Sequence, residues 1–365
     1  MSNQDWPKWL PIRTDLAELS PYGAPQIEVD VRLNTNENPY PLSSELQDAL
    51  LNELSRTLQD LNRYPDRDAI ELRSALAESI NRKHATGFDE DSIWVANGSN
   101  EIIQSILLAF EGSALGFEPS YSMHPLISRV VGKSWISIAR ETNFGIGPSQ
   151  IDVATSNESA KIYFITTPNN PTGNATSIEK IEDIAKRVSP RSGLVVVDEA
   201  YAEFASGPSA VELISSNPNI LVIRTMSKAF AFAGARLGYL IAHPKVIEAM
   251  LLVRLPYHLS SLTQAGARAA IANQDSLTKD VERIKIAREQ IVEELLKLGL
   301  RVVPSDANFL LFTGFPGESA DLWKKLLDKG ILIRDVGLPG YLRVTIGTEQ
   351  ENRAFLAAIK EVLRG

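Results

Sequence analysis

Apolar residues follow two patterns along this chain, short continuous runs and positions at helical spacing, and together these patterns predict an α/β protein. Short apolar runs at residues 93–96 and 194–197 are typical of strands that are buried on both faces of a sheet. Between residues 102 and 110 the apolar positions recur at helical spacing, as on one face of a helix. Because such strands and helices alternate from about residue 92 to 242, we expect a mostly parallel sheet with helices on both faces.

The pattern changes near residue 238 and again after residue 262. The apolar run at 238–242 follows the preceding strand too closely for a crossover helix, so we expect it to run antiparallel to its neighbours. A helical stretch at 263–298 then leads to a smaller α+β unit. In this unit we expect strands at 301–303, 308–312, 331–333 and 342–346. We expect helices at 320–327 and 349–363. We therefore expect a large domain over residues 36–262 and a small domain over 263–365.

Lys228 is the most informative residue of the chain. It stands at an expected strand end, eight residues before Arg236. A lysine amine there can form a Schiff base with an aldehyde cofactor and later act as a base, provided its surroundings leave it unprotonated. The clusters at 170–173 and 198–201 fit the same chemistry. Together they predict pyridoxal 5'-phosphate (PLP) as the cofactor.

Asp198 directly follows the apolar run 194–197, so its carboxylate should emerge at the carboxyl end of a parallel sheet, where ligands bind. PLP needs a carboxylate beside its pyridine nitrogen, because a protonated ring withdraws electrons from the reacting carbon. The alternative is that Asp198 only ends a strand or caps the next helix.

Asn170 and Tyr201 are candidates to donate hydrogen bonds to the phenolic oxygen of PLP, which would lower the pKa of the Schiff base. Asn170 also follows an apolar strand, at 161–165. The alternative for the segment 169–173 is an ordinary turn, because asparagine, proline and glycine are the usual turn residues. We expect Lys228, Asp198 and Tyr201 to be the catalytic residues.

The phosphate of the cofactor needs a group of hydrogen-bond donors. Gly98, Ser99 and Asn100 stand between an expected strand and an expected helix, where free N–H groups and the helix dipole favour an anion. Ser99 and Asn100 could equally be ordinary helix caps. Further hydroxyl groups and a positive charge for the phosphate come from Thr225, Ser227 and Arg236.

With these residues in place, the chain resembles the fold-type I aminotransferases and, among them, the histidinol-phosphate aminotransferases. The resemblance extends from about Tyr22 to the C-terminus. The motifs that carry it, in the order of the family, are at 34–39, 61–65, 97–101, 119–121, 167–173, 198–201, 227–230 and 342–347.

The resemblance implies roles that spacing alone does not give. Tyr121 would stack on the pyridine ring, and Tyr64 would reach the cofactor phosphate of the partner subunit in a homodimer. The N-terminal segment, residues 1–35, would pack with the small domain. The residues implied to contact substrate are Tyr22, Asn36, Arg334 and Arg343.

The resemblance also implies the reaction. The expected pair of substrates is L-glutamate and imidazole acetol phosphate, giving 2-oxoglutarate and L-histidinol phosphate in histidine biosynthesis. Three alternatives stay open at this point: an aromatic amino-acid aminotransferase, a PLP-dependent decarboxylase of a phosphorylated amino acid, and a non-catalytic PLP-binding regulator.

Composition narrows the other classes of function. The 365 residues carry a net charge of −8 and no run of Lys or Arg, which argues against a nucleic-acid partner. There is no cysteine for a disulfide or a thiol nucleophile, and the four histidines lack metal-ligand spacing. No apolar stretch suggests a membrane span or a secretion signal. We therefore expect a cytoplasmic enzyme that acts on small molecules.

Overall fold

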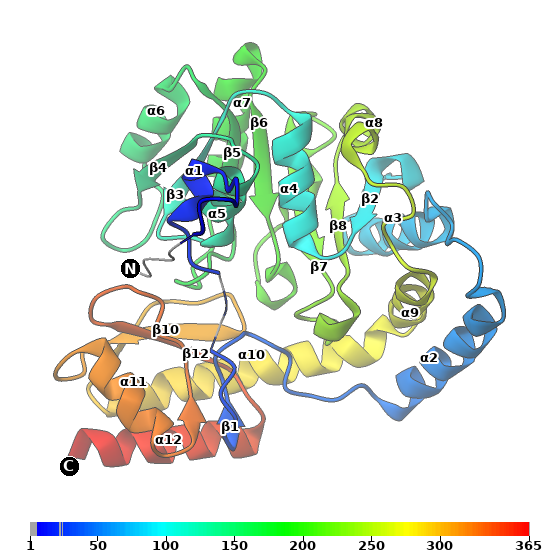
Figure 1. Cartoon of the computed structure of the whole chain (residues 1–365). Helices are drawn as coiled ribbons and strands as arrows, with labels where there is room; N and C mark the ends of the chain where they lie inside the picture. The colour runs from blue at the N-terminus through cyan, green and yellow to red at the C-terminus, as the bar shows by residue number, and fades with distance from the viewer. Residues whose placement is uncertain (1–5, 22, 24, 365) are drawn as a thin grey trace.

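A computed structural model describes residues 6–21, 23 and 25–364 of the chain. A seven-stranded sheet and a three-stranded sheet organise most of these residues, each with its own helices and its own apolar packing (Figure 1). We call the part around the seven-stranded sheet the large domain and the part around the three-stranded sheet the small domain.

The sheet of the large domain has the strand order β2-β8-β7-β6-β5-β3-β4. Only β8 runs antiparallel to its neighbours, so the mostly parallel sheet and the reversed strand near residue 238 are both confirmed. The strands are β2 (Ile93–Ala96), β3 (Ser113–Glu118), β4 (Trp135–Ala139), β5 (Ala160–Thr166), β6 (Leu194–Asp198), β7 (Ile220–Thr225) and β8 (Gly238–Ile241).

Helices cover both faces of this sheet, because neighbouring residues of each strand point to opposite faces and both sets are apolar. In β6, Val195 and Val197 join one apolar core, whereas Val196 joins the other. On the Val196 face lie α4 (Ser99–Ala109), α5 (Met123–Val130) and α8 (Pro244–Val253). On the other face lie α3 (Ile70–His84), α6 (Pro148–Ser156) and α7 (Ile178–Val188).

The helical stretch expected at 263–298 is two helices rather than one. The first, α9 (Ser261–Ala272), packs against α3 and α2 (Ser44–Thr57) of the large domain. The second, α10 (Gln274–Lys297), crosses to the small domain (Figure 1). Asn273 separates them, with φ −112° and ψ 24° and its side-chain amide donating to Ala269 O at 2.8 Å. The side-chain amide of Asn273 thus competes with backbone N–H groups for the carbonyl of Ala269. Such competition favours the end of a helix at this residue.

The small domain contains an antiparallel sheet of β9 (Arg301–Val302), β10 (Phe309–Thr313) and β12 (Tyr341–Thr345). Helices α11 (Ser319–Leu327) and α12 (Glu349–Arg364) pack with α10 around an apolar core that includes Phe309, Phe312 and Phe355. A separate two-stranded pair joins β11 (Ile331–Leu332) to β1 (Val31–Arg32) in parallel.

The N-terminal segment contacts both domains. Val31 and Arg32, near its end, pair with β11 of the small domain. Its beginning lies elsewhere, because Arg13 beside α1 (Thr14–Ala17) donates to Val130 O at 2.7 Å at the end of α5. Arg129 donates in return to Asp15 O at 2.6 Å. The first described part of the segment therefore lies against the large domain.

Short 3₁₀ helices complete the fold. They are η1 (Leu58–Asp60), η2 (Glu90–Ser92), η3 (Ser189–Arg191), η4 (Ala202–Phe204), η5 (Ala210–Leu213) and η6 (Ala233–Ala235).

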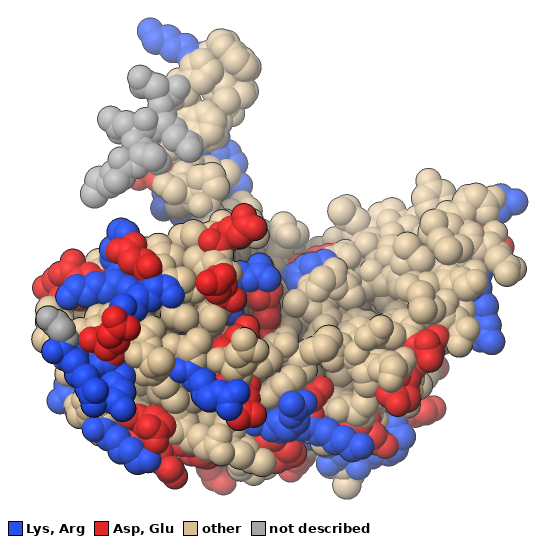
Figure 2. Space-filling view, turned by 90° about the horizontal axis from the view of Figure 1, so that it is seen from below, with Lys and Arg blue, Asp and Glu red and all other residues tan. Residues whose placement is uncertain are grey.

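Charged side chains are unevenly distributed over the face of the molecule that Figure 2 shows. In Figure 2, Lys, Arg, Asp and Glu are intermixed over the small domain, whereas the arm that projects to the right is mostly uncharged. Within the described ranges no helix combines the length and apolarity that a bilayer crossing requires. The same residues contain no group of three or more His, Cys, Asp or Glu side chains arranged to hold a metal ion.

Candidate active site

A cavity of about 530 Å³ opens at the carboxyl ends of β5, β6 and β7, between the two domains. The large domain contributes Asp198 and Lys228 to its lining, and the small domain contributes Arg334 and Arg343. The N-terminal segment completes the wall with residues 34–37. This position agrees with the rule that ligands of open α/β sheets bind beyond the carboxyl ends of the strands.

Lys228 lies on the loop that follows β7, with its side chain in the cavity. Its Nζ donates to Thr35 O at 3.0 Å. Burial lowers the pKa of the Lys228 ammonium to about 8, and the positive charges of Arg343 and Arg236 lower it as well, against the opposing charge of Glu37. The neutral amine that a nucleophilic lysine needs is therefore much more populated near neutral pH than in an exposed lysine.

Asp198 is the last residue of β6 and is only 2% exposed. Its Oδ2 lies 3.2 Å from Nε2 of His124, and its Oδ1 accepts a hydrogen bond from the backbone N–H of Ala200 at 3.2 Å. His124 is 1% exposed and stacks on Phe164, with 4.6 Å between ring centroids. With Nε2 protonated, His124 holds the carboxylate oriented toward the cavity.

His124 was not among the predicted site residues. It stands three residues after Tyr121, and its backbone N–H donates to Tyr121 O at 3.1 Å where α5 begins, at Met123. The rings of the two residues do meet edge to face, with 5.4 Å between centroids. Tyr121 lines the cavity, and its hydroxyl donates to Asn100 Oδ1 at 3.1 Å.

Tyr201 and Asn170 lie together in the cavity, as the sequence suggested. The Tyr201 hydroxyl accepts hydrogen bonds from the side-chain amides of Asn36 at 3.0 Å and Asn170 at 3.4 Å. Asn36 is fixed from the small domain, because Thr345 Oγ1 donates to its Oδ1 at 3.0 Å. The structure thus brings Asn36 into the hydrogen-bond group of Tyr201.

The residues proposed for an anion lie at the start of α4. Gly98 has φ +83°, and a Cβ there would lie 2.6 Å from Nη2 of Arg236. A Cβ on Gly238 would lie 2.6 Å from Ser99 N. The two glycines therefore let the guanidinium and β8 approach the helix N-terminus closely.

Two hydroxyl groups complete this end of the cavity. Thr225 Oγ1 donates to Ser227 Oγ at 3.0 Å, and Nη1 of Arg236 donates to the same Ser227 oxygen at 3.5 Å. Hydroxyl groups, a guanidinium and a helix N-terminus together make an environment that suits a phosphate.

Arg334 and Arg343 face each other across an antiparallel bridge, with reciprocal backbone hydrogen bonds of 2.9 Å. Side chains of such opposed residues project on the same side, and both line the cavity. The Arg343 guanidinium donates to Asn34 O at 2.8 Å and to Asn170 Oδ1 at 2.5 Å, and lies 5.1 Å from the ring centroid of Phe309. Both arginines could contact an anionic substrate.

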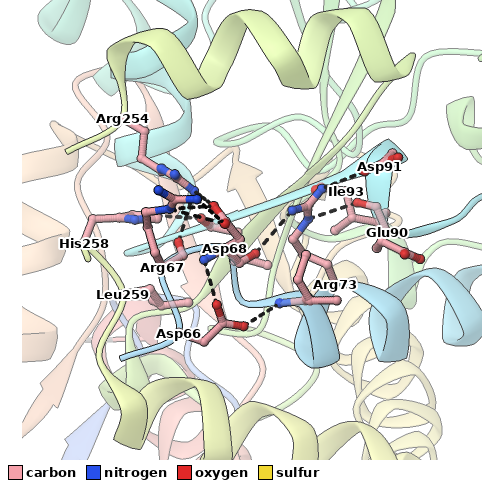
Figure 3. A network of polar contacts seen from close by, with 12 residues as sticks. Asp66, Arg67, Asp68, Arg73, Glu90, Asp91, Ile93, Arg254, His258 and Leu259 are labelled. Carbon is pink, nitrogen blue, oxygen red and sulfur yellow. Dashed lines mark hydrogen bonds and ion pairs between the residues drawn. The ribbon is translucent and has the colours of Figure 1, made fainter. Parts of the chain in front are cut away.

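Tyr64 does not line the cavity of its own chain. It is 80% exposed and stacks on Tyr257, with 4.5 Å between ring centroids. Figure 3 shows the polar network that holds this region. Asp68 binds Arg67 at 2.8 Å and Arg254 at 3.0 Å, and Asp66 accepts from the backbone of Ile70 at the start of α3 at 2.9 Å.

Tyr22, the remaining predicted substrate contact, lies outside the described residues. The other candidates, apart from Tyr64, lie in or at the edge of one cavity. Those that line it are Asn36, Ser99, Asn100, Tyr121, Asn170, Asp198, Tyr201, Thr225, Ser227, Lys228, Arg236, Arg334 and Arg343.

Comparison with known proteins gives a family match over most of the chain. The model of the family Aminotransferase class I and II matches residues 28–359. The chain is 51% identical to the histidinol-phosphate aminotransferase of Mycobacterium avium (strain 104), over 96% of this chain and 88% of that protein. It is 50% identical to the histidinol-phosphate aminotransferase of Mycobacterium sp. (strain JLS), over 96% of this chain and 93% of that protein.

Solved structures show the same fold. The histidinol-phosphate aminotransferase from Clostridium acetobutylicum superposes with a TM-score of 0.83 at 26% identity, covering 92% of this chain and 99% of its own. The one from Sinorhizobium meliloti, solved in complex with pyridoxal-5'-phosphate, superposes with a TM-score of 0.83 at 24% identity, covering 97% of this chain and 98% of its own.

Proposed function

Because this chain belongs to the class I and II aminotransferases, we propose that it transfers an amino group between L-glutamate and imidazole acetol phosphate, giving 2-oxoglutarate and L-histidinol phosphate. The observation that carries this proposal is the 51% identity to a histidinol-phosphate aminotransferase over 96% of the chain. The paired arginines of the cavity support it, because both substrates are anionic. As an enzyme of amino-acid biosynthesis, it would work in the cytoplasm.

PLP is the cofactor, and the residues of the cavity suit its three parts. The close approach that Gly98 allows between Arg236 and the start of α4 suits the phosphate. The buried Asp198 carboxylate suits the pyridine nitrogen, and the Lys228 amine suits the aldehyde. When bound, PLP draws electrons from the substrate carbon and carries the amino group from the first substrate to the second.

Lys228 is proposed to hold the cofactor and to move the reacting proton. Once the amino donor has displaced it, Nζ would take the proton from the α-carbon of the donor and pass it to C4′ of the cofactor, and for the acceptor it would move a proton in the reverse direction. The lowered pKa of this amine supports both uses, because the neutral amine is available near pH 8. Tyr201 and Asn170 would donate hydrogen bonds to the phenolic oxygen of the cofactor.

Asp198 is proposed to hold a proton on the pyridine nitrogen. The hydrogen bond to His124 supports this role, because it keeps the buried carboxylate in one orientation. The stack of His124 on Phe164 fixes the imidazole in turn.

Arg334 and Arg343 are proposed to bind the anionic group of each substrate in turn. Histidinol phosphate carries a phosphate and no carboxylate, whereas glutamate carries carboxylates. Arg343 is the shared contact, because its guanidinium is already held by Asn34 and Asn170. Arg334, on the opposite side of the bridge, would add the second guanidinium that a phosphate dianion favours.

The test is to measure each half-reaction alone by the change in cofactor absorbance. Wild-type protein should react with histidinol phosphate in preference to phenylalanine. Arg334→Ala should lower kcat/KM for histidinol phosphate far more than for glutamate, with a difference of about 2 kcal/mol or more in transition-state stabilisation. Equal losses on both substrates, or a wild-type preference for phenylalanine, would favour an aromatic amino-acid aminotransferase.

A homodimer is proposed as the working form. Large apolar side chains are exposed on the projecting α2 arm, at the end of α8 and on the loop after it, including Leu51 at 66%, Leu252 at 86% and Leu255 at 74%. Tyr64 and Tyr257 lie in this region and are also exposed. Such a surface suits burial against a second copy, with Tyr64 of the partner subunit reaching the cofactor phosphate.

A further inference from the structure

A network of buried charges lies behind the cavity, between the ends of β6 and β7. The side chains of Arg224 and Glu199 are 4% and 3% exposed, and Arg224 Nη2 lies 2.8 Å from Glu199 Oε2. A second carboxylate, Glu203, lies 3.0 Å from Arg224 Nη1. None of these three side chains lines the cavity, and the proposed mechanism uses none of them.

The hydrogen bonds of Glu199 are made to one short segment as well as to Arg224. Ser209 Oγ donates to Oε2 at 2.7 Å, and the backbone N–H of Ala210 donates to Oε1 at 2.7 Å. Arg224 Nη2 also donates to Ser209 Oγ at 2.8 Å. Both carboxylate oxygens are therefore held in place, and the geometry of the pair is fixed.

The pair is adjacent in sequence to two cavity residues. Glu199 follows Asp198, and Arg224 precedes Thr225. β6 and β7 are neighbouring parallel strands, in which Glu199 N donates to Ile223 O at 2.9 Å. Because successive side chains of extended chain point to opposite sides, Asp198 and Thr225 enter the cavity while Glu199 and Arg224 meet behind it.

Stability alone is a poor explanation for this network. Burying charges carries a desolvation penalty, and apolar residues of similar size are often as stable as a buried ion pair. Here two carboxylates surround one guanidinium. Nε2 of His84 lies 3.4 Å from Nη2 of Arg224. His84 adds no second positive charge at neutral pH, because burial and Arg224 lower the pKa of its imidazole. What the network does provide is a fixed spacing between two strand ends.

We propose that Glu199 and Arg224 are positioning residues that fix the distance between Asp198, at the pyridine end of the cofactor, and Thr225, at its phosphate end. They act through the backbone of the two strands and touch neither cofactor nor substrate. The inference rests on the proposed function insofar as it assigns those two ends to PLP.

Glu199→Gln tests the proposal, with Glu203→Gln as its matched control. Each change removes one carboxylate from the same guanidinium and keeps the shape of the side chain. Only Glu199, however, is joined by a peptide bond to a residue whose side chain lines the cavity, Asp198. Glu203 belongs to η4 and is not adjacent in sequence to Asp198 or Thr225. The measurements are the Kd for PLP, the pH midpoint of the bound-cofactor absorbance, and the Tm of the apoprotein.

We expect Glu199→Gln to weaken PLP binding about tenfold or more, because it weakens charged hydrogen bonds that set the site. The pH midpoint of the bound-cofactor absorbance should shift as well. Glu203→Gln should keep the Kd within about twofold of wild type and leave the midpoint unchanged, even if its Tm falls as much.

Two outcomes would overturn the proposal. If both variants lower the Tm but keep the wild-type Kd and midpoint, the network only stabilises the fold. If both change the Kd equally, the effect does not pass through the strand ends. Should Glu199→Gln fail to fold, Arg224→Lys keeps the charge without the forked contacts and is measured in the same way. The three measurements use no substrate. A failure of this proposal can therefore be told from a failure of the proposed function, in which the wild-type protein would not use histidinol phosphate.

Discussion

At the scale of single residues, Lys228 shows how a cavity sets the reactivity of an amine. Its ammonium is removed from water and lies near two guanidinium groups, while Glu37 opposes them. Both burial and like charge favour the neutral form of the amine. The same arginines that suit anionic substrates thus help to prepare the nucleophile.

This gives a prediction for the capture of PLP by apoprotein. The rate of covalent capture should rise with pH around a midpoint near 8, because the neutral form of Lys228 increases through that range. Arg343→Gln should move the midpoint upward, since one neighbouring positive charge is lost. Stopped-flow absorbance measures the rate, and borohydride reduction followed by peptide mapping locates the cofactor. A rate independent of pH, or label on another lysine, would contradict the assignment.

Sequence could predict residues that stand at strand ends or in motifs, and could not predict partners brought in by packing. Asp198 was recognisable because it ends an apolar run. His124 was not, because its contact with Asp198 spans 74 positions and depends on how α5 packs on the sheet. The Glu199–Arg224 pair was missed for the same reason.

At the scale of elements, strand periodicity carried most of the predictive information. The reversed β8 was predictable because too few residues precede it for a crossover helix. The break at Asn273 was not, since apolar residues continue at helical spacing on both sides of it. Nor was the docking of Arg13 on the end of α5, which uses backbone carbonyls that carry no sequence signal.

The loop that carries Tyr64 gives a prediction on stability. The Arg67 hydrogen bond and Arg254 lower the pKa of Asp68 to about 2, against the effect of burial. Such a carboxyl stabilises the fold above its unfolded pKa of about 3.9, and the contribution is lost as pH falls toward its folded value. Asp68→Asn should therefore lower the free energy of unfolding at pH 7, and with it the Tm, by about 1 kcal/mol or less in free energy because Asp68 is partly exposed.

The difference from wild type should shrink between pH 4 and pH 2, as thermal unfolding at several pH values would measure. Asp91→Asn is the control, because that carboxylate is 75% exposed and lies 3.6 Å from Arg73. A Tm difference that stays constant over the whole range would show that the charge of Asp68 is not responsible.

At the scale of the whole molecule, a shared site predicts complementation between inactive variants. Lys228→Ala and Tyr64→Ala should each be nearly inactive alone. In a mixed dimer one site carries both changes and the other carries neither. Random mixing of the two chains should thus restore about a quarter of the wild-type sites. Activity after co-expression, per bound cofactor, is the measurement. No recovery in purified mixed dimers would mean that Tyr64 serves its own chain.

The opposed Arg334 and Arg343 also have a kinetic consequence. In the proposed arrangement the same two arginines bind the substrates of both half-reactions, so glutamate and histidinol phosphate would compete for one site. Each would then also enter the aminated form of the enzyme, which is waiting for the carbonyl counterpart of the other, and would block it without reacting. The ratio of the two metabolite pools, and not only their amounts, would set how fast nitrogen flows through this enzyme.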